Sequence, residues 1–136
     1  MIERRVGKRQ LLRVGFDRIE GYIAGGIDAW RAAGLPISQM PQITVRQLRE
    51  RLERDEDLAV VDVRTASEWV NGHVEGAIHV PVGDISTSAA TLDSHGSVAT
   101  ICEGGYRSLL AASLLARAGL PNVVNVVGGM TAYRAQ

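Results

Sequence analysis

The apolar and polar positions divide the chain into short segments with alternating strand and helix signals. A helical spacing of apolar residues marks residues 45–52, and residues 108–118 are apolar almost all round, as expected for a helix that lies on a sheet. Short, mainly apolar runs that predict strands occupy residues 58–63, 77–80, 98–101 and 123–127. The run at 58–63, broken only by Asp62, is typical of a strand covered on both faces. This alternation predicts an α/β domain in three layers, with a central, mainly parallel sheet flanked by helices.

Two helix starts carry a clear capping signal. Thr44 is followed three residues later by Gln47, and Thr65 by Glu68, which is the spacing of a capping box. We therefore expect one helix after Thr44 and a short one after Thr65, the second ending at Gly72.

Two other segments lack a long periodic pattern. Residues 81–97 are polar and rich in small side chains, which predicts a helical turn near 82–85 followed by a loop. Residues 35–42 contain two prolines and are typical of a linker. The domain boundaries that we predict are residues 1–38 for an N-terminal segment, 39–42 for the linker, and 43–136 for a complete or nearly complete domain.

The N-terminal segment repeats part of the sequence near the C-terminus. Its pattern predicts a helix, a strand and a second helix over residues 3–14, 19–23 and 27–33. Gly-Gly-Ile-Asp-Ala-Trp-Arg at 25–31 parallels Gly-Gly-Met-Thr-Ala-Tyr-Arg at 128–134. A period of about one hundred residues is too long for a solenoid and indicates a duplicated domain, of which the first copy is only a tail.

Composition narrows the function classes. The 136 residues are 46% apolar and carry 15 basic and 15 acidic side chains, a balance that argues against a nucleic-acid or anionic-membrane partner. Basic residues cluster only at positions 4–13, where their spacing predicts the solvated face of a helix. No apolar run approaches the ~20 residues of a membrane span. The single cysteine cannot form an internal disulfide, and we expect a reducing compartment, the cytoplasm. The three histidines lack metal-ligand spacing, and we predict neither a metal nor an organic cofactor.

The candidate chemistry lies just after the third apolar run. Cys102 falls at the carboxyl end of the predicted strand, where open α/β sheets place their ligand sites, and Gly104, Gly105 and Arg107 follow it. Glycines and a helix start can form an anion cradle that favours thiolate over thiol. A lone cysteine after an apolar run is by itself more often a small buried hydrophobe. The two glycines and the arginine make a nucleophile the better interpretation.

Three charged residues precede the second predicted helix. Asp62, Arg64 and Glu68 could form a catalytic cluster or a structural one. Charges of mixed sign between a buried strand and a capped helix more often satisfy one another and the local backbone, so we favour a structural role.

Three motifs, in the right order, resemble the signatures of the rhodanese family of sulfurtransferases. The matches are residues 102–108 to Cys-x-x-Gly-x-Arg-Ser, residues 62–64 with Glu68 and then 72–81 to Asp-Val-Arg and Gly-His-Ile-x-Gly-Ala, and residues 128–130 with Tyr133 to Gly-Gly-Met/Ile-x-x-Trp. The resemblance spans residues 43–136. It implies a rhodanese-like domain whose active-site loop lies at the carboxyl end of a central strand.

The resemblance also implies a reaction. The Cys102 thiolate would attack the sulfane sulfur of thiosulfate or of a persulfide, and a thiol or cyanide would then take that sulfur from the Cys102 persulfide. Arg107 would orient the loop and bind an anionic donor, Ser108 would cap the helix, and Asp62, Arg64 and Glu68 would be structural. The substrate-binding loop would consist of Glu103, Gly104, Gly105, Tyr106, Arg107 and Ser108.

Two other functions compete with sulfur transfer. Protein tyrosine phosphatases and arsenate reductases have a similar loop with five residues between cysteine and arginine, whereas four intervene here. A smaller ring of amides suits a persulfide sulfur better than a phosphate. The second alternative is a binding or regulatory module without turnover, which the intact Cys102 disfavours. Glu103 is expected either to repel anionic donors or to point into solvent.

The resemblance extends to the N-terminal segment. Residues 1–38 are expected to be the C-terminal part of a preceding rhodanese-like repeat, as in tandem rhodaneses and metallo-β-lactamase-like fusions. The apolar side of this segment is then expected to pack on the complete domain or on a second chain, giving a homo-oligomer.

Overall fold

The computed structural model describes residues 8–9, 11–12, 15–54, 57–92 and 96–136. The chain forms two compact units, Met1–Gln39 and Met40–Gln136. In the described part of the chain, no helix has the length and apolar character needed to cross a membrane.

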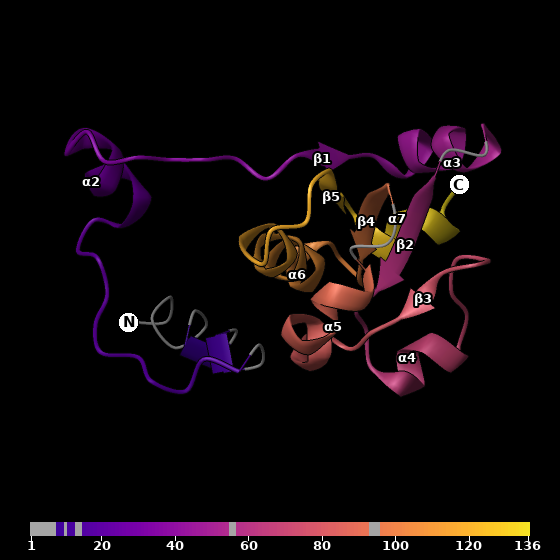
Figure 1. The fold of residues 1–136 in the computed structure, drawn as a ribbon, viewed down its shortest axis with the longest axis horizontal. Coiled ribbons are helices and arrows are strands. Elements are labelled where there is room, and N and C mark those ends of the chain that lie inside the picture. Colours follow the sequence, from indigo (N-terminus) through magenta and orange to yellow (C-terminus); the bar gives the residue numbers. More distant parts are fainter. Residues whose placement is uncertain (1–7, 10, 13–14, 55–56, 93–95) are drawn as a thin grey trace. The chain divides into compact units, whose positions relative to one another are not determined.

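A five-stranded, fully parallel sheet forms the centre of the second unit (Figure 1). The strand order is β1-β5-β4-β2-β3. In the register, Asp62 of β2 is opposite Ile101 of β4 and His79 of β3, so these three strands end at the same edge. The strands are β1 (Gln42–Ile43), β2 (Leu58–Asp62), β3 (Ile78–His79), β4 (Ser97–Ile101) and β5 (Val123–Val126).

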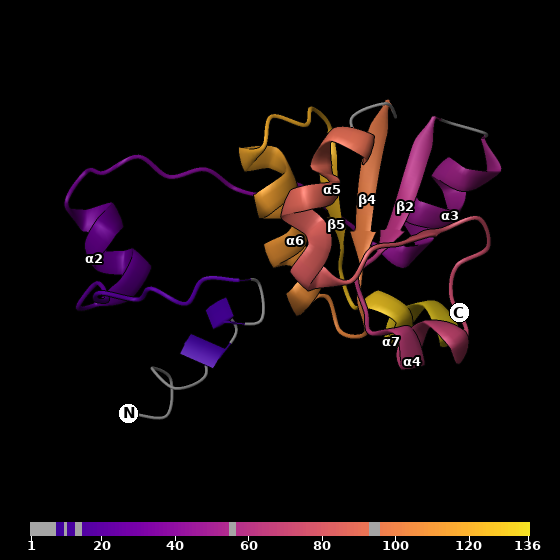
Figure 2. The same cartoon turned by 60° about the horizontal axis from the view of Figure 1, so that its bottom comes forward.

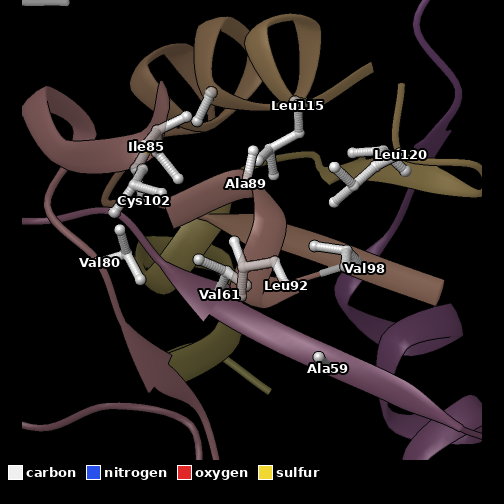
Figure 3. Close-up of a cluster of buried hydrophobic side chains, with 14 residues drawn as sticks. Ala59, Val61, Val80, Ile85, Ala89, Leu92, Val98, Cys102, Leu115 and Leu120 are labelled. Carbon is white, nitrogen blue, oxygen red and sulfur yellow. The ribbon is translucent and has the colours of Figure 1, made fainter. Parts of the chain in front are cut away.

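Helices cover both faces of the sheet, which confirms the predicted three layers. Helices α5 (Ile85–Leu92) and α6 (Tyr106–Arg117) share one core cluster with alternate strand residues such as Val61 and Val98 (Figure 3). Helices α3 (Val45–Glu53) and α7 (Gly129–Arg134) share the other cluster with the intervening strand residues. In Figure 2 the short helix α4 (Ala66–Val70) is seen towards the edge where β2 and β4 end.

Both predicted capping boxes are present. The backbone N–H of Gln47 donates to Thr44 Oγ1 at 3.2 Å, and the Thr44 N–H donates to Gln47 Oε1 at 2.8 Å. Thr65 and Glu68 make the same reciprocal pair at the start of α4. These boxes satisfy amide groups that a helix leaves unpaired in its first turn.

The prediction of a loop after residue 85 is wrong. A 3-10 turn, η1 (Val82–Asp84), leads directly into α5. Ile85, Ala89 and Leu92 lie on one helical face and are buried in the same core cluster as α6. Burial of this face outweighs the weak helix propensity of the serines and threonines between them.

The N-terminal unit differs from its prediction in one element. Helix α2 (Gly26–Ala32) forms as expected, and the helix predicted over 3–14 falls largely outside the described residues. Residues 19–23 do not form the predicted strand. They are not part of the described sheet, and a strand there would need a neighbour to pair with. Gln42, assigned to the linker, is part of β1 and pairs with Asn125 of β5.

Candidate active site

Cys102 lies at the carboxyl edge of the sheet, directly after β4. The chain then turns through a short loop to Gly105, whose φ of 97° places it in the left-handed region as the N-cap of α6. The Cys102 Sγ accepts the Gly105 backbone N–H at 3.1 Å and the Ser108 hydroxyl at 3.3 Å. Two hydrogen-bond donors from the loop and the first turn of α6 are therefore directed at one sulfur.

Cys102 is also buried, with 1% of its surface exposed, and belongs to the core cluster in Figure 3. Burial alone would fit a small core hydrophobe. The polar contacts of Sγ distinguish this cysteine from such a residue. The neighbouring rim of the loop is open, since Gly104 and Tyr106 are exposed.

The loop donors agree only in part with those predicted. Both Gly104 and Gly105 were expected to line the anion cradle, and in the structure it is the Gly105 amide that donates to the sulfur. Ser108 was expected to cap the helix, but it is the third residue of α6, is fully buried and donates its hydroxyl to the sulfur. The N-cap position is Gly105. Its backbone is non-helical, and α6 begins at the next residue.

Arg107 is held by Glu68 in a bidentate pair. Its two terminal nitrogens donate to the Glu68 carboxylate at 2.8 and 2.7 Å, joining the first turn of α6 to α4. The hydrogen bond from Arg107 is the main reason that the pKa of Glu68 falls from its ordinary value of 4.5 to about 2. Glu68 therefore pairs with the active-site loop and not with Asp62 and Arg64.

The low pKa of Glu68 predicts a pH-dependent contribution to stability. A carboxyl whose pKa is lower in the folded than in the unfolded chain stabilises the fold above its ordinary pKa. This contribution is lost as pH falls from 4.5 towards 2. We expect Glu68→Gln, which retains a capping side chain, to lower the free energy of unfolding by on the order of 1 kcal/mol at pH 7. In urea unfolding, the difference in free energy of unfolding between the wild type and Glu68→Gln should be smaller at pH 3 than at pH 7. An equal difference at both pH values would contradict the assignment.

Asp62 and Arg64 form a fully buried ion pair beneath the loop. The Arg64 side chain donates to the Asp62 carboxylate at distances of 2.7 to 3.0 Å and to the Gly72 carbonyl at 2.7 Å. Both side chains have no exposed surface. A buried pair with this many hydrogen bonds fixes the carboxyl end of β2 next to Cys102.

Glu103 points towards arginines. Its carboxylate accepts from Arg64 at 3.1 Å, from Arg134 of α7, and from the Thr131 hydroxyl at 3.3 Å. The Arg134 hydrogen bond, followed by the one from Arg64, lowers the pKa of Glu103. Glu103 is therefore an ionised, paired carboxylate, which neither sequence-based alternative anticipated.

Helix α7 supports the loop from below. The Met130 and Thr131 amides donate to the carbonyls of Cys102 and Glu103 at 2.8 and 3.0 Å. At Gly129 a Cβ would clash with the same two carbonyl oxygens. Gly129, Thr131 and Arg134 were not predicted as neighbours of the site, although the repeated Gly-Gly…Arg motif contains all three positions.

Two histidines contribute to an aromatic stack beside the site. The rings of His73 and His79 stack on Trp69, with centroid distances of 3.5 and 4.8 Å. His79 Nε2 also lies 2.8 Å from the Arg64 carbonyl oxygen. Across the described ranges, no group of three His, Cys, Asp or Glu side chains is arranged to hold a metal ion.

The fold and the loop together define an α/β domain that presents a hydrogen-bonded cysteine at the carboxyl edge of a parallel sheet. The family model for the rhodanese-like domain matches residues 44–136, and the chain belongs to this family. The chain is 35% identical over 98 residues to the putative sulfurtransferase YtwF of Bacillus subtilis (strain 168), covering 72% of this chain and 94% of that protein.

Two further relatives extend the comparison. The putative sulfur carrier protein YrkF of the same organism is 33% identical over 93 residues, covering 68% of this chain and 50% of YrkF. The chain therefore spans about half the length of YrkF. The crystal structure of SSP1007 from Staphylococcus saprophyticus subsp. saprophyticus is 34% identical, with a TM-score of 0.63, over 69% of this chain and 93% of that one. Relatives named sulfurtransferase place the chain in a sulfurtransferase family.

Proposed function

We propose that this protein is a sulfurtransferase that carries a sulfane sulfur on Cys102. The observation that carries the proposal is the pair of hydrogen bonds to Sγ, from the Gly105 amide and the Ser108 hydroxyl, at the start of a helix. We expect these donors to stay next to Sγ both in the free cysteine and in the persulfide. No metal or organic cofactor enters the proposed reaction.

The reaction has two half-steps. In the first, the Cys102 thiolate attacks the outer sulfur of the donor, a new S–S bond forms, and the donor's own bond to that sulfur breaks with its electron pair leaving on sulfite or on a thiolate. In the second, cyanide or a thiolate attacks the outer sulfur of the Cys102 persulfide and restores the thiolate. Each half-step conserves charge and needs no external oxidant or reductant.

Access to the buried thiol is expected from the exposed part of the loop. Cys102 is buried, whereas Gly104 and Tyr106 at the rim of the same loop are exposed. We propose that the donor sulfur enters over this rim, and that the outer sulfur of the persulfide lies closer to solvent than Sγ does. The acceptor can then reach the outer sulfur without unfolding the core.

Steady-state kinetics test the proposed function. Initial rates with varied donor and cyanide should follow a ping-pong pattern, because the donor product leaves before the acceptor binds. Sulfite should also be released from thiosulfate, once per protein, without acceptor. A non-catalytic binding module would give neither result, and cleavage of an aryl phosphate in place of sulfur transfer would support the phosphatase alternative.

We further propose that residues 1–38 are the tail of a preceding rhodanese-like repeat. The proposal is supported by the backbone of the two motif copies: Gly25 and Gly26 have φ values of 79° and 61°, and Gly128 and Gly129 have 77° and 54°. In the second copy this conformation holds the active-site loop, whereas no residue of α2 is buried. The exposed large apolar residues of the described N-terminal unit are Leu11, Leu12, Phe16, Tyr22, Ile23, Ile27, Leu35 and Ile37.

An apolar surface of this kind predicts self-association. We expect the full chain to form a homo-oligomer at a concentration where residues 40–136 alone remain monomeric. Light scattering over a concentration series measures both species. If both proteins are monomeric, packing on a second chain is contradicted.

A working thiolate also suits a reducing compartment, and we propose the cytoplasm.

A further inference from the structure

The charged side chains around the cysteine loop neutralise one another. Each of three arginines has a carboxylate partner: Arg64 with Asp62 and Glu103, Arg107 with Glu68, and Arg134 with Glu103. Three positive and three negative groups therefore cancel before the thiolate is counted. Arg107, expected to bind an anionic donor, is already engaged by both oxygens of Glu68.

This balance bears on the charge of the donor. Thiosulfate carries two negative charges and must approach a thiolate that carries a third. The –SO₃ group of thiosulfate would lose water on entering the loop. The arginines there are already neutralised by carboxylates, so they offset little of this desolvation cost. A persulfide on an uncharged thiol carries one negative charge, or none when its outer sulfur is protonated.

We infer that Glu103 sets the donor class: by neutralising Arg64 and Arg134 it makes the loop accept the persulfide of a thiol in preference to thiosulfate. This inference rests on the proposed sulfur transfer. In the favoured reaction, the Cys102 thiolate bonds to the outer sulfur of the persulfide, the donor's S–S bond breaks, and the thiol carrier leaves as a thiolate. A proton on the outer sulfur stays on that sulfur and becomes part of the Cys102 persulfide.

The position of Glu103 suits this role better than that of either other carboxylate. Asp62 is fully buried, and Glu68 lies at the start of α4. Glu103 is next to the nucleophile in sequence, and its side chain is 35% exposed, so its charge acts on molecules that enter from solvent. Its partner Arg134 is 45% exposed and would be free to face a donor if Glu103 lost its charge.

Two substitutions of opposite charge test the inference. Glu103→Gln keeps an acceptor for the arginines but leaves one uncompensated positive charge, whereas Arg134→Gln leaves one uncompensated negative charge. With the persulfide of 2-mercaptoethanol, whose carrier is uncharged, and thiosulfate as donors and cyanide as acceptor, we expect Glu103→Gln to raise the thiosulfate-to-persulfide ratio of kcat/KM about five- to tenfold. Arg134→Gln should lower the ratio by a similar factor, and both changes should shrink as salt is added.

Matched controls come from a pair on α3. Arg46 and Glu50 form an exposed salt bridge at 3.1 Å. Glu50→Gln and Arg46→Gln change the net charge by the same amounts, and neither should move the donor ratio.

The outcomes separate this inference from the function beneath it. Opposite shifts of the ratio in the two loop variants, with neither control shifting it, support the inference. An unchanged ratio, equal losses with both donors, or a wild-type preference for thiosulfate would overturn it while leaving sulfur transfer intact. Failure of the wild-type protein to use either donor would overturn the proposed function and, with it, this inference.

Discussion

Replacement of Cys102 by serine is expected to lower kcat/KM for sulfur transfer by roughly three orders of magnitude or more. A serine hydroxyl is not ionised near neutral pH and cannot store sulfur in an S–S bond. The change is nearly isosteric, and the oxygen can still accept from the Gly105 amide and the Ser108 hydroxyl that now contact the sulfur. The donor:cyanide assay measures the rate, and circular dichroism checks the fold.

Ser108→Ala is the matched control for this experiment. It keeps the thiol and removes one of the two donors to Sγ, so we expect a smaller loss, about tenfold. Retention of more than about a tenth of the wild-type rate by a folded Cys102→Ser protein would show that Cys102 is not the nucleophile.

Alanine at Gly129 is expected to cause the largest loss of stability among the substitutions proposed here, about 2–4 kcal/mol in the free energy of unfolding. The positive φ of 54° is itself unfavourable for a side chain. In addition, the new Cβ would lie 2.6 Å from the Glu103 carbonyl oxygen and closer still to that of Cys102. Because both partners are backbone atoms, relief requires α7 or the active-site loop to move.

Gly76→Ala separates the two causes. Gly76 also has a positive φ, 75°, but a Cβ there would have no heavy atom within 4 Å. We expect it to lower the free energy of unfolding by only about 1–2 kcal/mol. Urea denaturation of both variants, together with their sulfur-transfer rates, tests the assignment. Equal losses of stability would mean that the contact between α7 and the loop is not tight.

The layers of the fold could be predicted from the sequence because each depends on local patterns. Apolar runs located the main strands, and Thr44 and Thr65 with their partners located two helix starts. The errors concern long-range contacts, and two of them illustrate this. Helix α5 depends on burial of Ile85 and Leu92, and a strand at 19–23 would need a neighbouring strand.

The position of the candidate site was also predictable, but its ion pairs were not. A strand followed by glycines and a helix start indicates the carboxyl edge of a sheet. Partner choice depends on side chains that meet only in three dimensions: Arg64 and Glu103 are 39 positions apart, and so are Glu68 and Arg107. The sequence would look the same if Glu68 paired with Arg64 and Glu103 with Arg107. Sequence alone therefore could not assign Glu68 to Arg107.

The hydroxyl of Ser108 illustrates the same limit. A serine near a helix start is commonly a cap, and the sequence does not show where the helix begins to within two residues. The structure starts α6 at Tyr106, which turns Ser108 towards the sulfur one helical turn after the Gly105 cap.

The central claim is that the hydrogen-bonded Sγ of Cys102 carries a transferable sulfur. Because the chain contains one cysteine, the intact mass of the protein reports on this atom directly. After incubation with glutathione persulfide and removal of excess donor, the mass should rise by one sulfur atom. It should return to its original value after cyanide is added, and Cys102→Ser should show no change. An unaltered wild-type mass, or a gain of sulfur that cyanide does not remove, would contradict the account.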